Sequence, residues 1–178
     1  ATATANQVIT VTPVDDFPFT LNDIAITPED TAYLGTVVGN DTPSGDGGNV
    51  WALVGPDGGA LNGSVVMLPN GAYVYTPDAN FTGMDVFMYT LCDVDGYCST
   101  ASVMIFVSPV NDPPVANPDS TTTPYDTNVT FSADGNDTDI DGYIVGATVD
   151  LDPSTPAIDN TFTDASGNVW TVDTDGNV

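Results

Sequence analysis

Three aspartates alternate with other residues in one short turn, in the sequence Asp137-Thr-Asp139-Ile-Asp141-Gly142. Calcium takes about six to eight oxygen ligands in flexible geometry, so alternating carboxylates on a turn suit it well. Gly142 permits the tight curvature that such a turn requires. The alternative is that the three aspartates are ordinary polar turn residues. The spacing predicts a calcium site at Asp137, Asp139 and Asp141.

A second, looser group of acidic residues lies in the first half of the chain. Asp41 and Asp46 flank the sequence Thr-Pro-Ser-Gly and are followed by two further glycines. Together with Asp15 and Asp16 they could face a preceding domain and bind a cation there. Because glycine-rich spacing also suits a flexible loop, these four are the weaker candidate ligands.

The charge balance explains why cations are expected at all. The chain has 25 Asp and Glu residues and no Lys, Arg or His, which gives a formal net charge of -25. Carboxylates that folding brings together repel one another unless cations or salt screen them. The alternative is a solvated acidic surface that keeps the protein soluble in saline water.

The missing basic residues also exclude whole classes of function. Phosphate contacts require Lys or Arg, so nucleic acid is not an expected partner. Without His, neither a Ser-His-Asp nor a Cys-His nucleophile can be built, and no enzymatic activity is expected. No apolar run approaches the length of a membrane-spanning helix, so membrane insertion is not expected either.

Two cysteines, Cys92 and Cys98, lie between two runs of strand-forming residues. A zinc site is disfavoured because the chain has only two thiols and no His. The sequence favours a disulfide that closes a hairpin in an oxidising compartment, and the alternative is a pair of free thiols.

Short runs of Val, Ile, Thr, Tyr and Phe alternate with clusters of Gly, Pro, Asn and Asp along the whole chain, and no stretch has sustained helical periodicity. This pattern predicts an all-β sandwich. The clearest predicted strands are Val8–Val11, Val65–Leu68, Ala72–Tyr75, Val86–Leu91 and Ala101–Val107. Asn70-Gly71 predicts a hairpin turn between two of them, because both residues tolerate positive φ.

The chain repeats itself at an offset of 96 residues. Thr12-Pro-Val-Asp-Asp16 recurs as Ser108-Pro-Val-Asn-Asp112, and Gly39-Asn-Asp-Thr42 recurs as Gly135-Asn-Asp-Thr138. Thr27-Pro-Glu-Asp-Thr31 matches Thr123-Pro-Tyr-Asp-Thr127 at the same offset. Three matches in one register indicate a tandem repeat.

The repeat predicts three segments. Residues 1–13 are the counterpart of a last strand, residues 14–110 form a complete β-sandwich, and residues 111–178 form a second sandwich that lacks its last strands. Two explanations fit this arrangement. The chain is a window from a longer array, or Ala1 to Pro13 inserts into the unfinished domain of a neighbouring subunit and builds a fibre by strand exchange.

The linker between the two repeats carries Asn111 and Asp112, upstream of the Asp137 turn. With Glu29 from the first repeat, this pair could complete a calcium shell at the junction. The alternative is that Asn-Asp-Pro-Pro is simply a turn and linker sequence.

These motifs resemble the cadherin-like tandem repeats of bacterial surface adhesins, which are Ig-like arrays. The resemblance rests on Pro28-Glu29-Asp30 with Gly35-Thr-Val-Val38, on the linker Pro109-Val-Asn-Asp-Pro-Pro114, on the Asp137 turn, and on Tyr75-Thr-Pro-Asp-Ala-Asn-Phe-Thr-Gly83. It implies immunoglobulin-like sandwiches with Greek-key topology, calcium at the joints, and Asp93 as a further ligand. Pro109 and Pro113 replace ligands of the family pattern, which implies fewer or weaker calcium ions.

The function expected from these features is an extracellular structural or adhesive module at the cell surface, stiffened by calcium. Expected partners are neighbouring repeats or identical subunits, and a surface glycan or protein. A carbohydrate-binding accessory module is the alternative binding function. Five Asn-x-Ser/Thr triplets are candidate glycosylation sites in a host that modifies them, at Asn40, Asn62, Asn80, Asn128 and Asn136.

Overall fold

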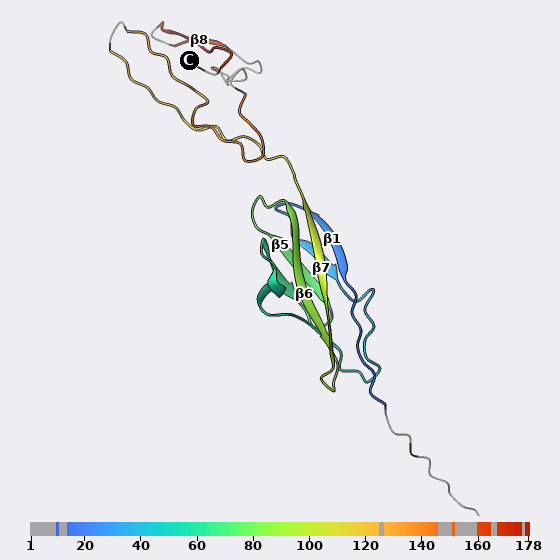
Figure 1. Cartoon of the computed structure of the whole chain (residues 1–178). Helices are drawn as coiled ribbons and strands as arrows, with labels where there is room; N and C mark the ends of the chain where they lie inside the picture. The colour runs from blue at the N-terminus through green and yellow to red at the C-terminus, as the bar shows by residue number, and fades with distance from the viewer. Residues whose placement is uncertain are drawn as a thin grey trace, which may run out of the picture. The chain divides into compact units, whose positions relative to one another are not determined.

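The computed structural model describes residues 10, 14–124, 127–145, 151, 160–164, 167–175 and 177–178. The chain divides into two compact units, Ala1–Val110 (unit 1) and Asn111–Val178 (unit 2), which are described separately (Figure 1). The predicted strand Val8–Val11 and the donor segment Ala1 to Pro13 lie outside the described residues, apart from Thr10. In the described part of the chain, no helix has the length and apolar character needed to cross a membrane.

Unit 1 is a sandwich of two β-sheets. The first sheet has the strand order β1-β7-β6-β3, and the second has the order β2-β5-β4. The strands are β1 (Asp23–Pro28), β2 (Tyr33–Thr36), β3 (Val50–Leu53), β4 (Gly63–Met67), β5 (Ala72–Pro77), β6 (Gly83–Cys92) and β7 (Cys98–Ser108). A short 3-10 helix, η1 (Pro56–Gly59), lies between β3 and β4. The predicted all-β sandwich is confirmed.

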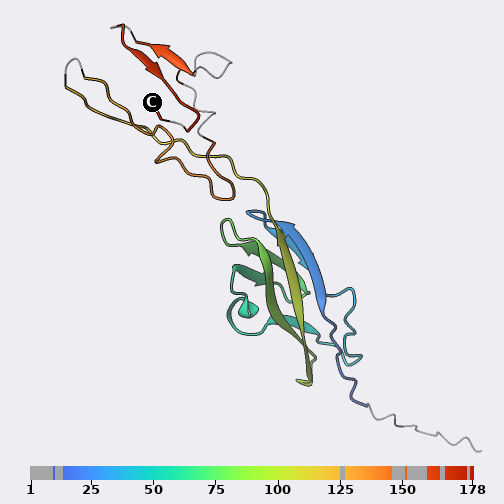
Figure 2. The same cartoon turned by 45° about the horizontal axis from the view of Figure 1, so that its top comes forward.

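The chain crosses repeatedly between the two sheets, so most neighbouring strands are not consecutive in sequence. β1 runs parallel to β7, while the pairs β2–β5, β3–β6, β4–β5 and β6–β7 are antiparallel. Figure 2 shows β1 (blue) beside β7, and β7 beside β6 (green). The long hairpin β6–β7 therefore forms the centre of the larger sheet.

Alternating burial along each strand builds the core between the sheets. In β6 the inward positions include Phe87, Tyr89 and Leu91, which are fully buried. The ring of Phe87 packs edge-on against Tyr73 of the opposite sheet, with 5.1 Å between ring centroids. The buried core consists of Ala25, Val37, Trp51, Val65, Tyr73, Tyr75, Phe87, Tyr89, Leu91, Ala101, Val103, Ile105 and Val107.

The predicted hairpin turn between β4 and β5 forms at Asn70-Gly71. Gly71 has a φ of 82°, a conformation that glycine adopts without strain, and its amide donates to the carbonyl of Leu68. A side chain at Gly71 would also collide with Val38, because the added Cβ would lie 2.6 Å from its Cγ2. The Asn-Gly sequence alone was therefore sufficient to predict this turn.

Unit 2 repeats local contacts of unit 1 at the offset of 96 residues. The isolated bridge Phe19–Thr42 in unit 1 has its counterpart in the bridge Val115–Thr138 in unit 2. Unit 2 also contains the paired strands β8 (Thr161–Thr163) and β9 (Val169–Thr171). Phe131, Phe162 and Trp170 line an open hollow of about 460 Å³, together with Asp119, Ser120, Thr121, Ala133, Leu151 and Val178.

Asp85 is a buried carboxylate at an inward position of β6. Its Oδ1 accepts the amides of Leu61 (3.1 Å) and Val86 (2.9 Å). Its Oδ2 accepts the amide of Asn62 (3.0 Å) and the hydroxyl of Tyr75 (3.0 Å). Four donors thus satisfy this carboxylate without a cation, and they tie the loop before β4 to the larger sheet.

We expect Asp85→Ala to lower the free energy of unfolding by about 3 kcal/mol, because the buried amides would lose their acceptor. Urea unfolding followed by circular dichroism measures the loss. The exposed acid Asp78 serves as the matched control, and Asp78→Ala should change stability by less than about 0.5 kcal/mol. Equal effects of the two substitutions would contradict the structural role of Asp85.

Candidate metal centre

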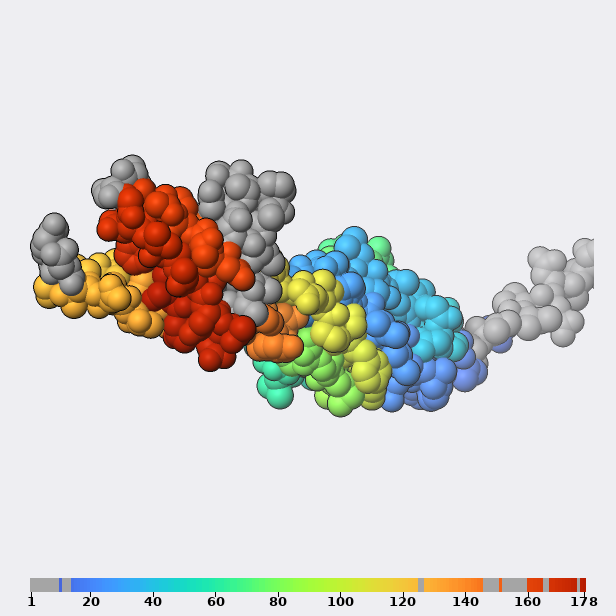
Figure 3. Space-filling view, turned by 90° about the horizontal axis from the view of Figure 1, so that it is seen from above, coloured from blue at the N-terminus to red at the C-terminus, as the bar shows by residue number. Residues whose placement is uncertain are grey.

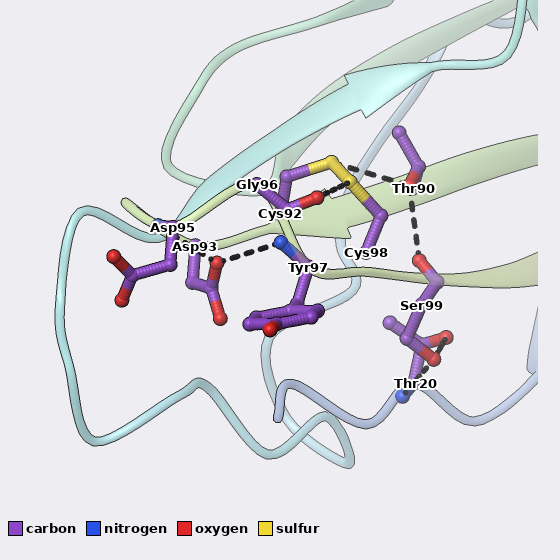
Figure 4. Close-up of a disulfide and its surroundings, with 9 residues drawn as sticks. All are labelled: Thr20, Thr90, Cys92, Asp93, Asp95, Gly96, Tyr97, Cys98 and Ser99. Atoms are coloured by element: carbon purple, nitrogen blue, oxygen red, sulfur yellow. Dashed lines mark hydrogen bonds between the residues drawn. A yellow bond between two sulfur atoms is a disulfide. The ribbon is translucent and has the colours of Figure 1, made fainter. Parts of the chain in front are cut away.

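A disulfide joins Cys92 to Cys98 and closes the hairpin between β6 and β7 (Figure 4). The two cysteines are directly opposite one another in the antiparallel register, so the bond fixes the last pair of the ladder. It encloses the loop Asp93–Tyr97. The disulfide predicted from the sequence is confirmed.

Asp93 is the first residue of this loop, and only 7% of its surface is exposed. Its Oδ1 accepts the amides of Asp95 (3.1 Å) and Tyr97 (2.9 Å), and Figure 4 shows the carboxylate turned towards Tyr97. Its Oδ2 is buried and has no hydrogen-bond partner among the described residues. A buried carboxylate oxygen without a hydrogen bond is costly, so a water molecule or a cation bound at this atom would be stabilising.

The hairpin loop carries a second carboxylate, that of Asp95, which interacts electrostatically with Asp15 and Asp46. Partial desolvation and then the negative charges of Asp46, Asp15 and Asp93 raise the pKa of Asp95 above its ordinary value. We call Asp15, Asp46, Asp93 and Asp95 the entry-end cluster, because it lies where the described chain enters unit 1. The fold therefore gathers like charges at this end of the sandwich.

Hydrogen bonds between loops hold the entry-end cluster in place. The amide of Asp16 donates to Oδ2 of Asp46 (2.7 Å), and the hydroxyl of Ser44 donates to the carbonyl of Asp16 (2.7 Å). The amide of Val94, in the hairpin loop, donates to the carbonyl of Gly47 (3.1 Å). The entry segment, the β2–β3 connection and the disulfide hairpin are thus linked to one another.

Tyr97 lies between the hairpin and the entry segment. Its hydroxyl donates to Oδ2 of Asp15 (3.3 Å), and its ring packs edge-on against Phe17 with 4.6 Å between centroids. The charge of Asp15 and the hydrogen bond to it raise the pKa of Tyr97. Tyr97 therefore contacts two members of the cluster, since its amide also donates to Asp93.

Asp41, one of the weaker candidate ligands, accepts hydrogen bonds from three residues of unit 1. Its Oδ2 accepts the indole N–H of Trp51 (2.8 Å), and its Oδ1 accepts the hydroxyl of Tyr89 (2.9 Å) and the amide of Leu21 (3.0 Å). Burial raises the pKa of the neighbouring Asp23, and the charge of Asp41 raises it further, against a hydrogen bond from Tyr89 that lowers it. This arrangement ties the start of β1 to the core.

The candidate residues of unit 2 repeat part of this arrangement. Oδ1 of Asp137 accepts the amide of Asn117 (2.7 Å), which matches the Leu21–Asp41 bond at the offset of 96 residues. The amide of Asp112 donates to both carboxylate oxygens of Asp141 (3.2 Å each), much as Asp16 donates to Asp46. Asp139 accepts the amide of Gly142 (3.0 Å). These three carboxylates face different backbone groups, and their role as ligands remains a prediction.

Glu29 lies at the other end of unit 1, where it is 5% exposed and accepts the amide of Val110 (2.6 Å). A carboxylate oxygen of Asp30, a residue that the sequence did not single out, lies within 4.8 Å of that of Glu29. The 11 residues of β7 separate this end from the Asp93 hairpin by roughly 33 Å. Glu29 and Asp93 therefore cannot bind the same ion, and as calcium ligands they remain predictions for two separate ends of unit 1.

At two of the candidate glycosylation sites, the side-chain amide of the Asn residue donates a hydrogen bond. The side-chain N–H of Asn40 donates to the carbonyl of Asn22 (3.1 Å), and that of Asn136 donates to Pro118 (3.3 Å). Asn62 is half-buried, whereas the side chains of Asn80 and Asn128 are exposed. All five sites remain predictions, as does Asn111, which is exposed and donates to the carbonyl of Asp112.

Comparison with known proteins agrees with the fold. Residues 15–106 match the family described as Bacterial Ig domain, and this chain belongs to that family. Such domains are commonly extracellular and typically structural. A curated relative, Protein GAMETE EXPRESSED 2 from Arabidopsis thaliana, is 34% identical over 92 residues, which cover 51% of this chain and 9% of that protein. The predicted immunoglobulin-like fold is thereby confirmed.

The raised pKa of Asp95 predicts how stability depends on pH without calcium. Because the pKa of Asp95 in the folded state exceeds its ordinary value of 3.8, the folded state binds more protons than the unfolded state between the two pKa values. We therefore expect the unfolding temperature in EDTA to rise as the pH falls from neutrality through the folded pKa.

Asp95→Asn removes this contribution. In EDTA at neutral pH the variant should unfold at a higher temperature than the wild type, and the difference should vanish well below pH 3.8, where Asp95 of the wild type is protonated in both the folded and the unfolded state. Asp78→Asn, remote from the cluster in sequence, controls for the change in net charge. If Asp78→Asn raised the unfolding temperature as much as Asp95→Asn, the effect would come from the net charge of the chain and not from the cluster.

Proposed function

We propose that unit 1 is a calcium-binding module of an extracellular, cadherin-like tandem array with a structural or adhesive role. The observation that carries this proposal is the buried Oδ2 of Asp93, which lacks a hydrogen-bond partner among the described residues and lies in a loop that carries a second carboxylate, that of Asp95. Membership in the bacterial Ig domain family supports an extracellular repeat module.

Calcium fits the chemistry of the entry-end cluster better than other common metals. The candidate donors are carboxylate oxygens of Asp15, Asp46, Asp93 and Asp95, and hard oxygen donors select calcium over the metals that prefer nitrogen or sulfur. Both cysteines are in the disulfide and the chain has no His, so zinc or copper would lack its preferred ligands. Magnesium demands octahedral geometry and keeps several waters, which suits a loop-built cluster less well.

Binding at the entry end would also have a mechanical effect. The entry segment, the β2–β3 connection and the disulfide hairpin meet there, and the repulsion that raises the pKa of Asp95 acts against their closure. A bound cation would turn this repulsion into attraction and would hold the loops together. In an array, the same end faces the chain that leads into the unit, so the ion would stiffen that connection.

A second calcium site is proposed at the end of unit 1 that carries Glu29 and Asp30, whose carboxylate oxygens lie within 4.8 Å of one another. Glu29 is 5% exposed and accepts the amide of Val110 (2.6 Å). Two carboxylates supply hard oxygen ligands of the kind that calcium prefers. Asn111 and Asp112, which follow in the linker, remain predicted ligands.

The test is thermal unfolding with EDTA, millimolar calcium, magnesium or added sodium chloride. At a calcium concentration about a hundred times Kd, stabilisation should reach about 2.7 kcal/mol, which corresponds to a rise of several degrees. Magnesium and sodium chloride should not reproduce it. An identical midpoint with calcium and with EDTA would sink the proposal.

Two variants then locate the entry-end site. Asp93→Asn keeps the size of the side chain but should reduce the calcium-dependent rise of unit 1, because the buried ligand loses its charge. Asp78→Asn changes the net charge equally and should retain the full rise. If Asp93→Asn retained it as well, calcium would have to act elsewhere in the chain.

A further inference from the structure

The outward face of the sheet β1-β7-β6-β3 has no charged side chain on its strands. Its outward positions include Ile24, Ile26, Met84, Met88 and Phe106, which are 71%, 67%, 54%, 45% and 42% exposed. With the half-buried Met104 we call these residues the apolar sheet face. This surface is unusual in a chain with 25 acidic residues.

The strand register makes the apolar sheet face continuous. Ile26 is opposite Phe106, and Phe106 is opposite Met84, so three apolar side chains form one row across β1, β7 and β6. Ile24 is opposite Met104 in the next row along the sheet. In the space-filling view of Figure 3, blue residues of unit 1 lie next to its yellow-green residues, in keeping with the pairing of β1 with β7.

From these observations we infer that the apolar sheet face binds a second copy of this chain, face to face across a two-fold axis. The five most exposed side chains present about 600 Å² per copy, so a dimer would bury about 1,200 Å² in total, the lower bound of a specific interface. Ile, Met and Phe are also the residue types found at the centres of interfaces.

The absence of charge on the strands of this face removes local repulsion between two copies that meet there. Two chains of net charge -25 repel one another through their acidic ends and turns, so they can come into contact only through an uncharged surface. A basic partner would instead be attracted to the acidic ends. An isologous contact also brings each apolar row onto an equivalent row of the other copy.

The long-range repulsion between the copies sets the conditions under which dimers form. The dimerisation constant should rise with ionic strength, because screening reduces repulsion while apolar burial is retained. This dependence is opposite to that of an association driven by attraction between charges. It does not require calcium, so the inference stands or falls separately from the proposed metal sites.

The outer face of the second sheet provides a matched control. Leu34 is opposite Val74, and Val74 is opposite Val66, so this face has a single apolar row. Val66 is 64% exposed, which is comparable to the exposed residues of the apolar sheet face. A Glu substitution at Val66 therefore adds the same charge to the other side of the same sandwich.

The experiment is sedimentation equilibrium of the whole chain in EDTA, at low and at high sodium chloride, for the wild type, Phe106→Glu, Met84→Glu and Val66→Glu. We expect a monomer–dimer equilibrium that strengthens with salt. Phe106→Glu and Met84→Glu should each weaken it at least about tenfold, because a charge would be buried in the contact. Val66→Glu should change it less than about threefold, and circular dichroism should show that all variants fold.

Several outcomes would overturn the inference. A wild type that stays monomeric at all salt concentrations would exclude a second copy and leave this face to a different partner. Equal weakening by all three substitutions would show that only added charge matters. Dimers that survive Phe106→Glu but are lost on deletion of residues 1–13 would instead indicate strand exchange.

Discussion

Folding must bring carboxylates together in a chain that has no cationic side chain to pair with them. In the interior of unit 1, N–H and O–H groups donate hydrogen bonds to the carboxylates in place of cations. Asp85 accepts four such bonds, Asp41 accepts bonds from Trp51, Tyr89 and Leu21, and Glu29 accepts the amide of Val110. Apart from the amide of Val86, each donor lies at least 10 residues away in sequence from the carboxylate that it binds. The carboxylates that would otherwise oppose folding thus become the points at which loops are fastened to the sheets.

The same constraint separates the surface of unit 1 into regions of different chemistry. The entry-end cluster is acidic, while the outward strand positions of the larger sheet are uncharged and partly apolar. Within the described residues of unit 1, the cluster contains a buried oxygen, Oδ2 of Asp93, that has no hydrogen-bond donor. A cation at the ends and a second copy on the face would therefore act on different surfaces. The two proposals would give one acidic chain contacts at the ends of unit 1 and on its larger sheet.

Much of the fold could be predicted from the sequence, because hydrophobic alternation and turn residues are local signals. The strands around Ala72–Tyr75, Val86–Leu91 and Ala101–Val107, the Asn70-Gly71 turn and the Cys92–Cys98 disulfide are present. The roles of individual acids could not be predicted, because they depend on contacts distant in sequence. Asp41 has the same turn context as a ligand but accepts bonds from Trp51 and Tyr89. Asp85 was overlooked, although an acid at an inward position among Phe87, Tyr89 and Leu91 indicates a satisfied buried carboxylate.

The most direct test of the central claim is terbium luminescence excited through tyrosine, because terbium replaces calcium at oxygen sites and Tyr97 contacts both Asp15 and Asp93. The account predicts sensitised emission from the wild type that calcium displaces. Tyr97→Phe should lose most of this emission while calcium still raises its unfolding temperature, and Asp93→Asn should lose both. Emission that calcium does not displace, or that is unchanged in Tyr97→Phe and Asp93→Asn, would contradict a cation site at the disulfide hairpin.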